Sequence, residues 1–261
     1  MAIALNHAKD RPMALPDPIP SASLILLRDA AEGLEVFMVR RHAGLRFAAG
    51  ATVFPGGRVD PEDRAPDGWT LDDAPAADLP LRLAAIREAF EECGILLVRE
   101  PLDGARLAAL RAPSPLGFGQ RLRAAGVRPA TGALVPFARW ITPETVWRRF
   151  DATFFLAPAP AGQDAVVDGG EAVEGLWAAP RAVLEADEAG RLSLVFATRM
   201  NLTRLAACRT VREALEAAAR HQPLVPILPR FADTAAGPVL RIPEGAGYTP
   251  TEVAAGLVRL G

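Results

Sequence analysis

Short apolar runs in the first third of the chain alternate with turn residues, which is typical of β-strands. Residues 21–28 and 34–41 flank an Asp-Ala-Ala-Glu-Gly turn and predict a β-hairpin. Residues 51–54 predict a third short strand, followed by a loop at Pro55-Gly56-Gly57, where two glycines give the backbone freedom. Further strands are predicted at residues 134–142, 151–157 and 171–177.

The spacing of apolar residues changes to a helical period from about Leu79, and Gly94 marks the predicted end of that helix. Residues 60–78 are rich in Pro, Asp and Ala without a period, so they are predicted to form a loop. Two short helices are expected within residues 104–126, another from Pro180, and one longer amphipathic helix over residues 197–221. Residues 1–20 read as a tail, and those from Pro223 as a segment wrapped on the domain. The pattern predicts one mixed α/β domain with a helical C-terminal extension.

Composition excludes several classes of function. The 261 residues are 50% hydrophobic and 23% charged with a formal net charge of −2, so neither nucleic acid nor an anionic membrane is expected as a partner. No apolar run approaches the length of a membrane span, and the first twenty residues do not resemble a signal peptide. Two cysteines fit a reducing compartment. We therefore expect a cytoplasmic enzyme, with the oligomeric state open and a homodimer compatible with the sequence.

Three glutamates lie within one turn of the helix that begins near Leu79. Glu88, Glu91 and Glu92 stand at i, i+3 and i+4, which places their carboxylates on one face. Like charges at this spacing repel one another, and a divalent cation would reverse that repulsion. Mg²⁺ and Mn²⁺ prefer oxygen ligands of this kind. A solvated acidic face is the alternative interpretation.

Two features upstream bear on this helix. Gly56 and Gly57 let the backbone approach a ligand closely, and Asp63 is a further carboxylate that a loop could fold back toward the glutamates.

These residues resemble the Nudix box, whose family pattern is G-x5-E-x7-R-E-U-x-E-E-x-G-U with U apolar. The second half of the pattern is matched at every fixed position by Arg87-Glu88-Ala89-Phe90-Glu91-Glu92-Cys93-Gly94-Ile95. The first half departs in two places. Asp63 stands where the family has Glu, and residues 64–86 fill a stretch for which the pattern has seven residues. The box would therefore span residues 57–95 with an insertion at 64–86.

A second resemblance lies just upstream of the box. Arg41-His42-x3-Arg46-x3-Gly50-x3-Phe54-Pro55-Gly56-Gly57 is similar to a motif of the coenzyme A (CoA) diphosphatase branch of this superfamily. Segments 140–143 and 148–155 are similar to parts of its mammalian members.

The resemblance implies an α/β/α sandwich with a mixed sheet. Residues 1–20 would be an N-terminal tail, 21–190 the Nudix domain and 191–261 a helical extension packed on it.

It also implies a hydrolase that uses Mg²⁺ or Mn²⁺ to cleave the diphosphate of a small nucleotide-like molecule. Glu91 and Glu92 would be metal ligands, Glu88 a ligand or the group that deprotonates the attacking water, and Arg87 the residue that orients the glutamates. Asp63 is as consistent with ligation as with a water-mediated or structural role.

Five residues are candidates for contact with the substrate. Arg41 and Arg46 have the guanidinium geometry that suits phosphates, or are exposed arginines at a strand end. Gly56 and Gly57 would bring the backbone to the ligand. Glu171 falls where many relatives keep an additional carboxylate, and a plain surface position is equally compatible.

Three functional hypotheses follow. The first is cleavage of CoA or acyl-CoA to 3′,5′-ADP and (acyl-)4′-phosphopantetheine. The second is the same chemistry on ADP-ribose, NADH or a nucleoside triphosphate, because loops choose the substrate of a fold. The third is a Nudix-fold binding module that has lost catalysis.

Overall fold

The computed structural model describes residues 17–64, 74–146 and 148–260. Its centre is an eight-stranded mixed sheet, in which six strands follow the order β3-β2-β1-β6-β5-β8, while β4 pairs with β1 and β7 with β2. The central strand β1 is antiparallel to β2 and β4 and parallel to β6. The strands are β1 (Ile19–Ala30), β2 (Gly33–Arg41), β3 (Thr52–Val53), β4 (Gly56–Arg58), β5 (Val135–Ile141), β6 (Phe150–Pro158), β7 (Ala172–Ala178) and β8 (Pro226–Ile227).

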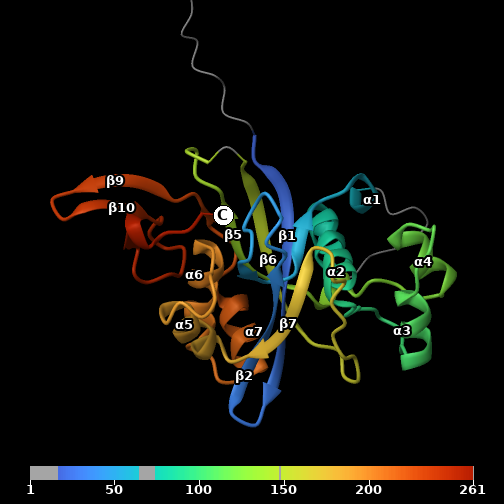
Figure 1. Ribbon diagram of the computed structural model, residues 1–261. Helices are drawn as coiled ribbons and strands as arrows, with labels where there is room; N and C mark the ends of the chain where they lie inside the picture. Colours follow the sequence, from blue (N-terminus) through green and yellow to red (C-terminus); the bar gives the residue numbers. More distant parts are fainter. Residues whose placement is uncertain (1–16, 65–73, 147, 261) are drawn as a thin grey trace, which may run out of the picture.

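Helices cover both faces of this sheet (Figure 1). α2, α3 and α4 lie on one side, and α5, α6 and α7 on the other. The helices are α1 (Pro61–Arg64), α2 (Leu79–Cys93), α3 (Gly104–Arg111), α4 (Phe118–Ala124), α5 (Pro180–Glu188), α6 (Phe196–Leu205) and α7 (Val211–Arg220). The predicted α/β/α sandwich with a mixed sheet is therefore confirmed.

The two layers of helices explain why residues 24–27 of β1 are an unbroken apolar run. Successive side chains of a strand point to opposite faces, and here both faces are buried. Leu24 and Leu26 pack into the core beneath α2, whereas Ile25 and Leu27 pack into the core beneath α6 and α7. All four side chains are fully buried.

The predicted helix over residues 197–221 is wrong, because the chain forms two helices there. α6 ends at Leu205, and α7 begins after Thr210. The Thr210 hydroxyl accepts a hydrogen bond from the Glu213 amide, and the Glu213 carboxylate accepts one from the Arg209 amide. A threonine and a glutamate at this spacing satisfy the free amides of a helix start, which favours a new helix over a continuous one.

Three other segments differ in part from expectation. Gly56–Arg58 is a short strand, β4, instead of a loop. Within residues 60–78, α1 and a 3-10 turn (Ala76–Asp78) replace parts of the predicted loop, and residues 65–73 lie outside the described residues. Of the predicted tail, 1–16 lie outside them too, and β1 begins at Ile19.

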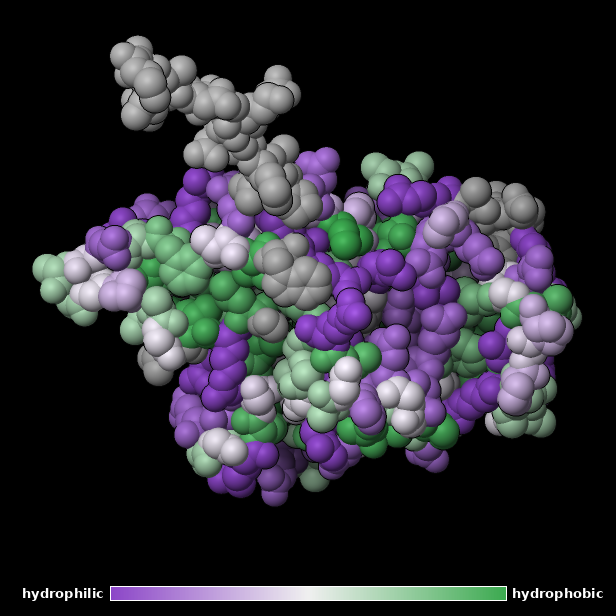
Figure 2. All heavy atoms as spheres, turned by 45° about the horizontal axis from the view of Figure 1, so that its top comes forward, coloured by the Kyte–Doolittle hydropathy of each residue, from purple (hydrophilic) through white to green (hydrophobic). Residues whose placement is uncertain are grey.

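The C-terminal extension is helical only in its first part. Beyond α7, β8 pairs in parallel with β5, so the extension adds a strand to the central sheet. A separate three-stranded sheet follows, with β9 (Arg230–Thr234), β10 (Gly237–Arg241) and β11 (Glu252–Ala254), and ends in a 3-10 turn (Ala255–Leu257). Figure 2 shows hydrophobic side chains gathered on the side of β9 and β10, next to a largely hydrophilic middle of the molecule. No helix within the described residues is both long and apolar enough to span a membrane.

Candidate active site

The helix α2 carries the predicted site, and it forms as the sequence predicts. Its inner face, including Ile86 and Ala89, is fully buried against the sheet. Gly94 ends it in the left-handed conformation, with φ of 69°, and its amide donates to the Phe90 carbonyl. Residues 79–86 belong to the insertion relative to the Nudix box pattern. In the structure they form the first turns of this helix.

Arg87 is the centre of the charged network on α2. Its guanidinium binds Asp63 with two hydrogen bonds of 2.9 and 3.2 Å, and donates to Glu88 and Glu91 at 2.9 Å each. A fifth bond, of 2.9 Å, reaches the Arg58 carbonyl. Burial alone would lower the pKa of Arg87, but hydrogen bonding to Asp63 and the charges of the three carboxylates outweigh it and raise that pKa.

Asp63 lies in α1, which folds back onto α2 across a sequence separation of 24 residues. Its side chain is 3% exposed, and it also accepts a hydrogen bond from the Asp60 amide at 2.9 Å. Both carboxylate oxygens therefore have partners, so the structure favours the structural role of Asp63 over ligation.

The three glutamates occupy different environments. Glu92 is 5% exposed and accepts a hydrogen bond of 3.1 Å from the Gly56 amide, whereas half of the Glu91 side chain is exposed. Burial, together with repulsion from Glu88, raises the pKa of Glu92 to about 8 against the opposing effect of the Gly56 amide. Burial raises the pKa of Glu88 to about 7 despite the nearby Arg87 guanidinium. The pKa of Glu91 is also raised, chiefly by burial.

The donor set of these glutamates fits a divalent cation. Glu92 is buried and the Glu88 side chain is 17% exposed, and their negative charges repel each other. A hard cation that bound their oxygens would offset both the burial and the repulsion. Among the described residues, no three acidic, His or Cys side chains are already grouped as a complete metal site. Arg87 holds Glu88 and Glu91 in this arrangement.

The two glycines ahead of α2 are packed too closely for any side chain. A Cβ atom at Gly57 would overlap the Glu88 carboxylate. At Gly56 it would overlap the Ala22 carbonyl and Ser23 of the neighbouring strand β1. Contacts within the protein therefore require glycine at both positions, and the approach of their backbone to a ligand stays a prediction.

This difference predicts distinct effects of two alanine substitutions. Gly57→Ala is expected to displace only a flexible carboxylate, so hydrolysis falls while the melting temperature changes little. Gly56→Ala pushes against the backbone of β1 and is expected to lower the free energy of unfolding by about 1–3 kcal/mol. Thermal unfolding and kcat measured on both variants check this. Equal destabilisation by the two would contradict it.

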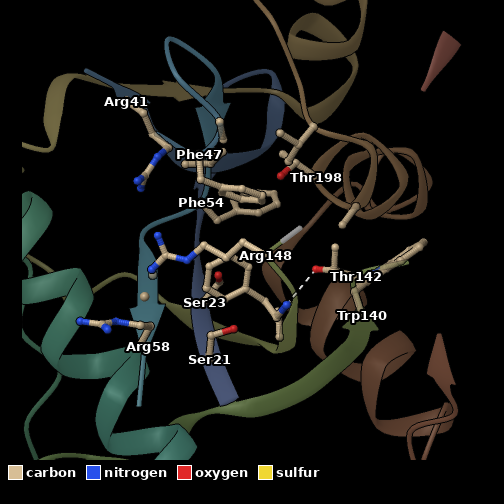
Figure 3. A pocket seen from close by; sticks show the side chains of 18 of the residues that line it. Ser21, Ser23, Arg41, Phe47, Phe54, Arg58, Trp140, Thr142, Arg148 and Thr198 are labelled. Atoms are coloured by element: carbon tan, nitrogen blue, oxygen red, sulfur yellow. Dashed lines mark hydrogen bonds between the residues drawn. The ribbon is translucent and has the colours of Figure 1, made fainter. Parts of the chain in front are cut away.

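A pocket of about 590 Å³ opens beside the C-terminal half of α2. Glu88 and Glu91 line it together with Gly56, Gly57 and Arg87. Figure 3 shows the guanidinium groups of Arg41, Arg58 and Arg148 on the side of the pocket that is nearest to α2. Arg46 also lines the pocket and is exposed. The structure thus brings together both predicted arginines and the acidic helix.

Arg41 connects Glu92 with Glu171. One guanidinium nitrogen lies 3.8 Å from Glu92 Oε1 and another 3.9 Å from Glu171 Oε2. The Asp168 carboxylate holds the backbone beside Glu171 by accepting hydrogen bonds from the amides of residues 170–172. Glu174 lies three residues further along, in β7, and instead pairs with Arg40 on the exposed surface.

The sequence analysis did not include Arg58 or Arg148 among the candidate site residues. Both line the pocket, and within the described part of the chain no carboxylate pairs with either guanidinium. Arg148 lies 5.3 Å from the ring centre of Phe150. The signal for Arg58 was its position directly after the two glycines. Arg148 gave none, because charge beside a turn is common.

Comparison with known proteins supports this picture. A family model described as the NUDT19 Nudix domain matches residues 67–205. The human acyl-coenzyme A diphosphatase NUDT19 is 27% identical over 209 residues, which cover 59% of this chain and 56% of that protein. The chain thus spans little more than half the length of this curated relative.

A solved structure gives the same family. The Nudix hydrolase from Alicyclobacillus acidocaldarius is 32% identical and superposes with a TM-score of 0.65, covering 78% of this chain and 97% of the other. The chain therefore belongs to the Nudix family.

Proposed function

We propose that this Nudix hydrolase cleaves the diphosphate of CoA or acyl-CoA, giving 3′,5′-ADP and (acyl-)4′-phosphopantetheine, and that it requires Mg²⁺ or Mn²⁺. One observation carries the proposal: Arg41, Arg58 and Arg148 line the same pocket as Glu88 and Glu91 of α2. The motif of residues 41–57 and the name of the human relative favour CoA as the substrate.

The arginines would bind the substrate. A diphosphate is negatively charged and repels an approaching nucleophile. A guanidinium group offsets that charge and binds two phosphate oxygens at once. Arg41 is held near Glu92 and Glu171, whereas Arg58 and Arg148 have no carboxylate partner in the described residues and are available to phosphate.

The glutamates would hold the metal ions and handle the proton. Glu88, Glu91 and Glu92 are proposed as the ligands, with Arg87 positioning Glu88 and Glu91 through its hydrogen bonds. Bound divalent ions lower the pKa of water and neutralise charge that develops on the phosphate oxygens. Glu88 lines the pocket, and if it does not bind the metal it is the group we assign to accept the proton of the attacking water.

We further propose that residues 21–190 form the catalytic domain and that 191–261 are an extension packed on it. Pairing of β8 with β5, and contact of α6 with α5, support the packing of the extension on the domain.

A substrate panel tests the proposal. The purified protein is incubated with CoA, acetyl-CoA, ADP-ribose, NADH and nucleoside triphosphates, each with Mg²⁺, Mn²⁺ or a chelator, and products are identified by mass spectrometry. We expect 3′,5′-ADP from the CoA compounds, the highest kcat/KM for these, and no turnover with the chelator.

Two outcomes of the panel would contradict the proposal. A higher kcat/KM for ADP-ribose, NADH or a triphosphate would assign the same chemistry to another substrate. No turnover of any compound, with no specific binding of metal, would indicate a binding module without catalysis.

A further inference from the structure

The start of α6 forms part of the pocket wall. Val195, Phe196, Ala197 and Thr198 all line the pocket, and the helix that they begin is ten residues long. Figure 3 shows the Thr198 hydroxyl directed into the pocket from the side opposite to Arg58. The C-terminal extension thus presents the N-terminal end of a helix to the pocket, across from the arginines.

The first amides of α6 lack the usual cap. The first four amides of an α-helix have no acceptor within it, and the side chain of the residue before the helix often accepts from the second or third of them. Here that residue is Val195, whose side chain has no acceptor. The Phe196 amide donates to the Arg259 carbonyl at 2.7 Å. Within the described residues, no acceptor binds the amides of Ala197 and Thr198, which come next.

The Thr198 side chain is an independent sign of a ligand. The residue is only 2% exposed, yet its hydroxyl makes no hydrogen bond with any described part of the chain. Buried hydroxyl groups are nearly always hydrogen-bonded, because an unpaired one costs free energy. By comparison, the hydroxyl of Thr203 on the same helix donates to the Arg199 carbonyl at 2.9 Å. A hydroxyl and two amides therefore offer hydrogen bonds to a group in the pocket.

The charge around these donors favours an anion. The N-terminal end of a helix carries partial positive charge, and free amides there bind phosphate groups well. The nearest acidic side chain is Asp187, and it already accepts hydrogen bonds from Arg199 and Arg259. The Arg259 side chain also lines the pocket. A neutral carbonyl could accept from the same donors but would gain less from the helix end.

This anion site is separate from the arginines assigned to the diphosphate. Arg41, Arg58 and Arg148 lie on the side of the pocket nearest to α2, and Thr198 lies across from them (Figure 3). A molecule that fills both sites carries a diphosphate and, apart from it, a further phosphate. CoA has this arrangement, because its ribose bears a 3′-phosphate monoester. ADP-ribose and NADH have the diphosphate alone.

We infer that the N-terminal end of α6, with the Thr198 hydroxyl, binds the 3′-phosphate of CoA and makes the enzyme select CoA over nucleotides that lack this group. This inference rests on the proposed function and deepens it by naming a specificity-determining residue. Loss of the 3′-phosphate should lower kcat/KM by about thirtyfold or more, since hydrogen bonds to a charged group are stronger than neutral ones.

The test compares kcat/KM for CoA with that for dephospho-CoA, which lacks only the 3′-phosphate. Thr198→Val keeps the shape of the side chain and should lower the ratio of CoA to dephospho-CoA by about tenfold. Thr198→Ser should restore most of that ratio. Thr203→Val, which removes an exposed hydroxyl from the same helix, is the control and should leave the ratio unchanged. Because the Thr198 hydroxyl has no partner in the described protein, Thr198→Val should not lower the melting temperature.

Nucleotide binding to the wild type covers the case in which a Thr198 variant does not fold. Titration calorimetry compares 3′,5′-ADP with 5′-AMP, neither of which contains a diphosphate. We expect a Kd for 3′,5′-ADP that is lower by about tenfold or more.

The outcomes separate this inference from the proposed function. Equal cleavage of CoA and dephospho-CoA, or equal Kd values for the two nucleotides, overturns the inference alone. So does Thr198→Val if it slows both substrates equally, because its hydroxyl would then contact another part of the substrate, such as pantetheine. No cleavage of any CoA compound by the wild type instead overturns the proposed function, and the inference with it.

Discussion

Glu92→Gln is expected to lower kcat by about a thousandfold while leaving the fold intact. Stabilisation of charge by a bound ion contributes several kcal/mol to such reactions, and tenfold in rate corresponds to about 1.4 kcal/mol. The amide of glutamine can still accept the hydrogen bond from the Gly56 amide but binds a cation poorly. Removing one of several repelling carboxylates should leave the melting temperature equal or slightly higher. Steady-state kinetics and thermal unfolding measure the two effects.

Glu174→Gln is the matched control for this substitution. This substitution also removes one negative charge, but Glu174 lies on the exposed surface, where its carboxylate pairs with Arg40 at 2.9 Å. Its kcat should stay within about twofold of the wild type, because exposed ion pairs contribute little. Near-normal turnover by Glu92→Gln would contradict the assignment of Glu92 as a ligand. Glu91→Gln is expected to behave as Glu92→Gln does.

Arg87→Ala is expected to lower the free energy of unfolding by about 3–5 kcal/mol, as for other buried ion pairs that lose one partner. Asp63 is buried and would lose the two hydrogen bonds that balance its charge. The same substitution frees Glu88 and Glu91, so we expect kcat to fall as well. Arg87→Lys should rescue little, because an ammonium group cannot reproduce the paired bonds to a carboxylate.

A double-mutant cycle separates the ion pair from other effects. Asp63→Ala combined with Arg87→Ala should cost clearly less stability than the sum of the two single substitutions. Arg139→Ala supplies a control, since Arg139 also binds an aspartate, Asp151, through two hydrogen bonds but is partly exposed. It should cost about 1 kcal/mol or less. Additive effects of Asp63→Ala and Arg87→Ala would contradict the proposed coupling.

The sequence predicted the helix of the site and most of the sheet, for identifiable reasons. The glutamates of α2 follow helical spacing, and Gly94 ends the helix in the conformation that favours glycine. The hairpin of β1 and β2 follows from two apolar runs around a turn. Such local patterns are readable because periodicity and turn chemistry act within a few residues.

Contacts between distant segments could not be read in the same way. The pairing of Asp63 with Arg87 depends on how α1 folds back, and no local pattern encodes it. Leu260 reaches the pocket because the Phe196 amide donates a hydrogen bond to the carbonyl of the preceding residue, Arg259. These two residues are 63 positions apart in the sequence. Thr210 and Glu213 have the spacing of residues that cap the start of a helix, and so they indicate the break between α6 and α7. The prediction of one helix instead followed the apolar periodicity of residues 197–221.

The central claim is that Glu88, Glu91 and Glu92 hold divalent cations against a diphosphate. Crystals of the protein soaked in Mn²⁺ test it most directly, through anomalous difference density at the manganese absorption edge. We predict a peak in contact with these carboxylates that disappears in Glu92→Gln. An empty site at saturating Mn²⁺, with the three side chains directed into solvent, would contradict the account.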